Sequence, residues 1–119
     1  KTKRAAFKSK AAIKNENISA DLRFGHDSYI APLLTLMDIK GTNIKEDDPN
    51  NIYKVWCDFK VTPMAANIQI IFYKNKNNND IIVKFLHNEK EVGIPIKTDI
   101  FPYYKWNDVR DYYINKLKN

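Results

Sequence analysis

The fold is decided at residues 21–28, which read Asp21-Leu22-Arg23-Phe24-Gly25-His26-Asp27-Ser28. The residues that follow, up to Met37, are mostly apolar and predict a helix. Residues 18–24 predict a strand, and Gly25 permits a tight exit from it. The pattern therefore places an imidazole and a carboxyl group side by side where a strand gives way to a helix. Free backbone amides at the start of a helix can bind anions, so this junction is a candidate site.

The His-Asp pair also has a purely structural interpretation. An Asp before a helix is often only its N-cap, and a His near the end of a strand is often a hydrogen-bonded structural residue. Two residues by themselves do not separate this interpretation from a functional one, because short motifs match by chance. The surrounding sequence has to decide.

The rest of the chain predicts strands at residues 52–61, 66–73 and 81–86. A turn at residues 88–91 would return the chain through residues 92–96, and a last helix, capped by Asn107 or Asp108, would run to Leu117. Residues 3–14 can form a further helix, although their apolar positions define no clean face. No internal repeat and no domain boundary is visible, so residues 1–119 form a single segment, for which we expect an α/β architecture with a mainly parallel or mixed sheet flanked by helices, the fold implied by the family resemblance given below.

The positive charge is concentrated at one end of the chain. The formal net charge is +6, and residues 1–14 contain six basic residues and no acid, so the remaining sequence is neutral. Such a run usually is a solvated helix flank, although it can bind nucleic acid or an anionic membrane. Only Arg4, Arg23 and Arg110 are arginines, which argues against base recognition. We therefore expect no nucleic-acid partner. No apolar run approaches the roughly 20 residues of a membrane span, so we also expect no membrane span.

Cysteine and metal chemistry are limited. The single cysteine, Cys57, lies in an apolar run and is predicted to be a buried small hydrophobe. One cysteine excludes an intrachain disulfide and a four-cysteine zinc site. We expect neither a metal nor a cofactor.

Three stretches together resemble one enzyme family. The segment from Leu22 to Ser28 with the apolar helix after it resembles the His-Asp segment of the histidine acid phosphatases, the clade-two histidine phosphatases that include phytases and multiple inositol polyphosphate phosphatases. Residues 62–73 resemble the strand that follows in bacterial members, and residues 85–106 are similar to their C-terminal region. The match is tightest at residues 20–37 and looser toward the end.

The resemblance implies a mechanism and a role for each residue of the pair. In the family, a His within Arg-His-Gly-x-Arg-x-Pro attacks phosphorus and becomes phosphohistidine. By the motif, Asp27 would be the proton donor to the leaving alcohol, and His26 would be the phosphate ligand that donates to a phosphoryl oxygen. The implied substrates are phosphomonoesters, including inositol phosphates. Family members are commonly exported, so the resemblance also implies a periplasmic or secreted setting.

The sequence departs from the family at the nucleophile. None of the three arginines is followed by His, and the only other histidine, His87, lies in a hairpin-like context. We therefore expect this chain to be the C-terminal part of a histidine phosphatase domain, with the missing N-terminal part as its partner. The chain has no initiator Met, which agrees with that expectation. By itself it is predicted to be inactive.

Two alternatives remain open at this stage. The chain can be a stand-alone binding module with a basic N-terminal arm for nucleic acid or anionic surfaces. It can also be a natural truncated pseudo-enzyme that only binds phosphate esters.

Overall fold

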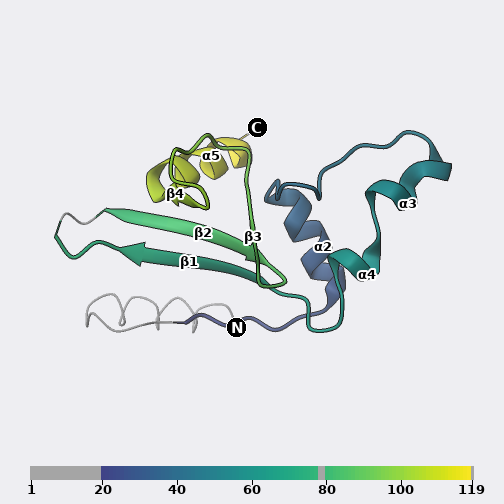
Figure 1. Cartoon of the computed structure of the whole chain (residues 1–119), viewed down its shortest axis with the longest axis horizontal. Coiled ribbons are helices and arrows are strands. Elements are labelled where there is room, and N and C mark those ends of the chain that lie inside the picture. Colours follow the sequence, from purple (N-terminus) through teal and green to yellow (C-terminus); the bar gives the residue numbers. More distant parts are fainter. Residues whose placement is uncertain (1–19, 78–79, 119) are drawn as a thin grey trace.

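A computed structural model describes residues 20–77 and 80–118 of the chain (Figure 1). Its helical elements are α2 (Asp27–Leu36), the 3-10 turn η1 (Pro49–Asn51), α3 (Ile52–Val55), α4 (Asp58–Val61) and α5 (Trp106–Lys118). Its strands are β1 (Ile68–Lys74), β2 (Ile81–His87), β3 (Lys90–Val92) and β4 (Tyr103–Lys105).

The sheet is organised around β2. Strand β1 pairs with β2 in antiparallel register, from Ile68 opposite His87 to Lys74 opposite Ile81. Strands β3 and β4 also pair antiparallel with β2, at its C-terminal and N-terminal halves respectively. Because β2 has neighbours along both edges, it is the best protected strand, and its Val83 and Phe85 are fully buried.

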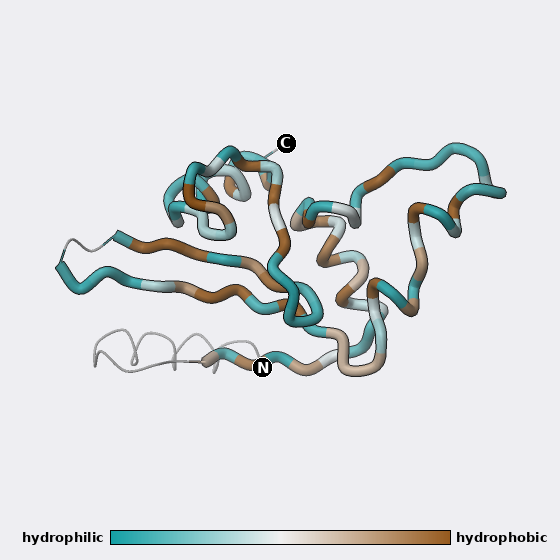
Figure 2. The backbone as a smooth tube through the Cα atoms, in the orientation of Figure 1, coloured by the Kyte–Doolittle hydropathy of each residue, from teal (hydrophilic) through white to brown (hydrophobic). Residues whose placement is uncertain are grey.

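The core lies between the sheet, α5 and the C-terminal half of α2. Figure 2 shows hydrophobic segments along β1 and β2 and within α2. Apolar side chains alternate along the strands, so one face of the sheet meets α5. The buried hydrophobic residues are Leu34, Met37, Ile39, Val83, Phe85, Ile94, Tyr104 and Val109. This core therefore fixes where α2 lies, and α2 carries the His-Asp junction.

Helix α2 ends in a Schellman turn. The amide of Asp38 donates to the Thr35 carbonyl and the amide of Ile39 donates to the Leu34 carbonyl, both at 3.1 Å. Leu34 and Ile39 are both buried in the core, which supplies the hydrophobic contact typical of this motif. Asp38 takes the left-handed position with φ 52°, where glycine is the usual residue.

Several sequence predictions are confirmed. The chain is an α/β fragment, and α2, β1, β2 and the last helix lie within a few residues of their predicted bounds. The predicted turn is confirmed as a two-residue loop, Asn88-Glu89, between β2 and β3. The last helix begins at Trp106 instead of after an Asn107 or Asp108 cap.

Other predictions are wrong, two of them because strand propensity alone does not decide the structure. Residues 20–24 form no strand, since no described strand lies beside them, and residues 18–19 lie outside the described part. Residues 52–61 form α3 and α4, after the Asp48 carboxylate accepts from the Asn50 amide and starts the helical turn η1. Every strand pairing among residues 20–77 and 80–118 is antiparallel, where a mainly parallel or mixed sheet was expected.

The predicted helix at residues 3–14 and its basic run lie outside the described residues, so both stay predictions. Among the helices that the structure describes, none combines the length and the apolar character needed to cross a membrane.

Candidate active site

His26 and Asp27 lie at the N-terminal end of α2. His26 is the N-cap residue, in extended conformation, and Asp27 is the first helical residue. The His26 carbonyl accepts from the Tyr29 amide at 3.0 Å and closes the first turn. The described residues before the junction, 20–25, are exposed. The predicted juxtaposition of imidazole and carboxyl group is therefore present, although it follows an unpaired segment and not a strand.

The two side chains are available to a ligand. Both residues are exposed, and the His26 ring makes no capping hydrogen bond. Its neighbour is Tyr29, with ring centroids 6.3 Å apart. The Asp27 Oδ1 atom accepts from the Ser28 backbone amide at 2.7 Å, and the residue as a whole is exposed. The first turn of a ten-residue helix also carries free amides and the positive end of its dipole, both of which favour an anion there.

Tyr29 is the site neighbour that sequence reasoning missed. It is 70% exposed and lies one turn after His26. Tyr29 follows His26 by three residues at the start of a helix, and residues three apart on a helix share a face, so this spacing is the signal for it.

The second histidine has a structural role. His87 Nε2 lies 2.7 Å from the Val61 carbonyl oxygen, and Asn88 Nδ2 donates to the same oxygen at 3.1 Å. The Asn88 side chain is oriented by the Asn67 amide, which donates to its Oδ1, so its amide nitrogen points to Val61. A carbonyl oxygen can only accept, so this 2.7 Å contact requires His87 Nε2 to carry the proton. His87 thus ties the end of α4 to β2.

Two arginines of the described part form ion pairs with nearby acids. Arg23 forms an ion pair with Asp21 at 3.5 Å, and Arg110 pairs with its neighbour Asp111 at 3.1 Å. Cys57 is half-buried and free, where full burial was expected. No group of three or more potential metal ligands occurs in the part of the chain that the structure describes.

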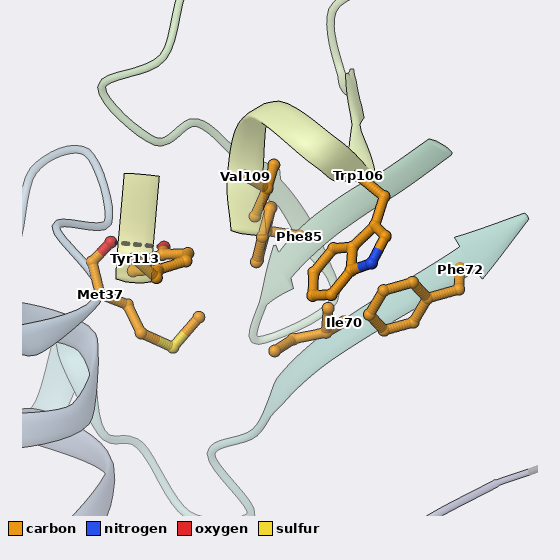
Figure 3. Close-up of a pocket in the computed structure, with 7 residues that line it drawn as sticks. All are labelled: Met37, Ile70, Phe72, Phe85, Trp106, Val109 and Tyr113. Carbon is orange, nitrogen blue, oxygen red and sulfur yellow. Dashed lines mark hydrogen bonds between the residues drawn. The ribbon is translucent and has the colours of Figure 1, made fainter. Parts of the chain in front are cut away.

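An apolar hollow lies apart from the His-Asp junction. It has a volume of about 190 Å³ and lies between the sheet and α5 (Figure 3). Trp106 meets Phe72 edge to face, with centroids 5.0 Å apart, at one end of it. Its lining residues are apolar or aromatic: Met37, Ile70, Phe72, Phe85, Trp106, Val109 and Tyr113. No charged donor faces it, so a phosphate group has no partner there.

Comparison with known proteins identifies a family. The model of the histidine phosphatase superfamily (branch 2) matches residues 5–88, well over half of the chain and including the His-Asp junction. No curated protein matches the sequence. The family match indicates a phosphatase-type function. With an exposed His-Asp pair at the start of a helix in an α/β fragment, the chain belongs to the histidine phosphatase superfamily, branch 2.

Proposed function

We propose that this chain is part of a histidine acid phosphatase that hydrolyses phosphomonoesters through a phosphohistidine intermediate. Asp27 is the proton donor to the leaving alcohol, and His26 is a phosphate ligand. The observation that carries the proposal is the placement of both exposed side chains at the N-terminal end of α2, inside the matched region.

The nucleophile comes from outside these 119 residues. The sequence has no Arg-His-Gly-x-Arg-x-Pro motif, and His87 is engaged by Val61. The radius of gyration, 16.3 Å, exceeds the roughly 13.5 Å expected for an independent domain of this length. Exposed Leu22 and Phe24 beside the site also favour a larger domain in which they are covered. We infer that the N-terminal part of the same domain supplies the nucleophile and that residues 1–119 are inactive without it.

The proposed first step uses Asp27 as an acid. The nucleophilic imidazole nitrogen forms a bond to phosphorus while the bond from phosphorus to the ester oxygen breaks. The departing oxygen takes the electron pair of that bond and the proton of Asp27, and the alcohol leaves. A positioned general acid contributes about 10²–10⁴ in rate, most for an alkoxide, which is a poor leaving group.

The proposed second step restores the site. Water attacks phosphorus, the bond between phosphorus and nitrogen breaks, and its electron pair returns to the imidazole. The Asp27 carboxylate takes a proton from the attacking water and is ready for the next cycle. In both steps an N–H of the His26 ring and the free amides of α2 face the phosphoryl oxygens, where negative charge spreads.

The substrate class and cellular setting follow from the family resemblance. We propose phosphomonoesters with alkyl leaving groups, among them inositol phosphates, and an exported, periplasmic or secreted protein. Comparing hydrolysis of inositol phosphates with that of sugar phosphates by the active phosphatase tests the first, and cell fractionation tests the second.

The deciding experiment compares leaving groups. In the phosphatase that contains these residues, Asp27→Asn should slow turnover of an alkyl phosphate by about 10²–10⁴ and that of p-nitrophenyl phosphate far less, because p-nitrophenolate departs without a proton. Asp21→Asn removes a carboxylate six residues earlier and is the matched control, expected to leave both rates near the original. Equal losses for the two substrates in Asp27→Asn would contradict the proton-donor role.

A further inference from the structure

The C-terminal end of α2 is fixed by side chains from α5. The Asp38 Oδ2 atom accepts from the Tyr112 hydroxyl at 2.6 Å and from the Lys116 ammonium. Its Oδ1 atom accepts from the side-chain amide nitrogen of Asn43, Nδ2, at 2.8 Å. Tyr112 and Lys116 are four residues apart and share one face of α5, so they hold the carboxylate at two heights along that helix. Both donors meet the same oxygen, Oδ2, so they fix its position, and the direction of α2 needs a second attachment point.

A third bond reinforces this contact. The Tyr113 hydroxyl donates to the Met37 carbonyl at 2.8 Å, the bond drawn as a dashed line in Figure 3. Met37 is the C-cap residue of α2, whose carbonyl has no partner within the helix. Three side chains of α5 therefore bind two successive residues at one end of α2.

Asp38 is not required by the turn itself. At φ 52° a glycine avoids the steric cost that an aspartate bears. The side chain is only 16% exposed and uses both oxygens. The hydrogen bonds from Lys116 and Tyr112 lower the pKa of its carboxyl, so it is charged at neutral pH. What the aspartate adds to the turn is the bond to α5.

The opposite end of α2 is far less constrained. Its first residues, from His26 to Tyr29, are exposed, while Leu34 and the residues after the helix reach the core. The helix has ten residues and is therefore about 15 Å long. A tilt of about 10° at the fixed end would move the free end by roughly 2.6 Å over that length. Misplacement of a catalytic group by about 1 Å can cost about 10²-fold in rate.

We propose that Asp38 is a positioning residue: its bonds to Tyr112 and Lys116, together with the bond from Tyr113 to Met37, set the direction of α2 and thereby the place of Asp27 and His26. The part of the proposal that concerns catalysis rests on the proposed function. The surface of α5 that bears the two donors thus controls a reaction at the other end of a neighbouring helix.

The first arm of the test measures geometry, independently of activity. Spin labels at Ser28→Cys and Arg110→Cys, both exposed, report the distance between the free end of α2 and α5 in a Cys57→Ala background. Asp38→Gly relieves the backbone strain while removing the carboxylate, and Tyr112→Phe with Lys116→Met removes the donors and keeps Asp38. Both should broaden the distance distribution. Thr98→Val, which removes the bond to the Tyr103 carbonyl elsewhere, should not. An unchanged distribution in Asp38→Gly overturns the proposal.

The second arm measures turnover by the phosphatase that contains these residues, without labels. Asp38→Gly should lower kcat for an alkyl phosphate by about 10²-fold while KM changes little, and should lower p-nitrophenyl phosphate turnover less. If Asp27→Asn discriminates between these substrates and Asp38→Gly does not, Asp38 does not act through Asp27 and the proposal falls. If Asp27→Asn itself fails to discriminate, the proposed function is wrong, and the distance measurement alone decides whether Asp38 directs α2.

Discussion

The Tyr112 hydroxyl donates a 2.6 Å hydrogen bond to the Asp38 carboxylate across 74 residues of sequence. Asp38 lies inside the region that matches the histidine phosphatase family, whereas Tyr112 lies beyond residue 88, where that match ends. The last helix is therefore attached directly to the helix that bears the candidate site. Removing α5 would take away the donors to Asp38 Oδ2 and to the Met37 carbonyl.

This contact predicts a pH dependence of stability. The Asp38 pKa is lowered by its hydrogen bonds to Lys116 and Tyr112, so its contribution is present above the ordinary carboxyl pKa and is lost as the pH falls through the lowered one. The hydrogen bond to Asp38 raises the pKa of Tyr112 to about 12, so that contribution is present below the ordinary value of 10.0 and is lost as the pH rises through about 12. Urea unfolding between pH 3 and 12 should show both losses.

Asp38→Asn and Tyr112→Phe are the matching variants for this prediction. Each should cost about 1–2 kcal/mol at neutral pH, since a hydrogen bond to a partly buried charged group is lost. Tyr112→Phe should also shift the alkaline limb, leaving the contributions of Tyr113, whose pKa burial raises to about 12, and of Lys84, whose pKa is raised by its hydrogen bond to Glu91. A pH profile identical to that of the original protein would contradict the assignment.

Substitutions of the two histidines should have different effects, on substrate binding for His26 and on stability for His87. His26→Asn removes an exposed side chain without a hydrogen bond and should change the melting temperature by no more than about 1 °C. It should weaken phosphate ester binding in the active phosphatase about 10–100-fold, as expected for a lost charge-assisted contact worth about 1.5–3 kcal/mol.

His87→Asn should lower stability and leave substrate binding unchanged. It loses the bond to the Val61 carbonyl and should cost about 1 kcal/mol of stability, with substrate binding unchanged. Thermal melts and KM values for both variants check the pair. Reduced binding in His87→Asn, or a large loss of stability in His26→Asn, would reverse the assignment of roles.

Leu34 should anchor α2 to the core. Leu34→Ala empties a fully buried position and should destabilise the chain by about 2–5 kcal/mol. Leu33, its neighbour in the same helix, is 43% exposed, so Leu33→Ala should cost less than about 1 kcal/mol. Denaturant titrations give the two values, and similar costs would show that α2 packs on another face.

The loop between β2 and β3 carries removable strain. Asn88 and Glu89 both have positive φ, 49° and 66°, which a two-residue hairpin of this type requires and which favours Asn-Gly. Glu89→Gly should therefore raise stability by about 0.5–1 kcal/mol. Glu91→Gly, in β3, should lower it, because a strand residue and the ion pair with Lys84 are lost. A melting temperature that falls in Glu89→Gly would contradict this account of the loop.

Much of the fold was predictable because its signals are local. The alternating apolar residues of β1 and β2 and the apolar run of α2 specify their elements without long-range help. The strand predicted at residues 52–61 is wrong. Aromatic and β-branched residues favour strands in general, but here Asp48 starts a helical turn just before them. Residues 20–24 have strand character as well, but a strand exists only where a neighbour pairs with it.

The sequence by itself determined that His26 and Asp27 are adjacent at the start of a helix, because that depends only on neighbouring residues and on an apolar period. It also determined that no Arg-His nucleophile motif lies within the chain. Only the tertiary structure decided where that helix points. The contact between Asp38 and the donors Tyr112 and Lys116 joins residues 74 and 78 positions apart, and no local pattern encodes which distant side chains will meet one carboxylate.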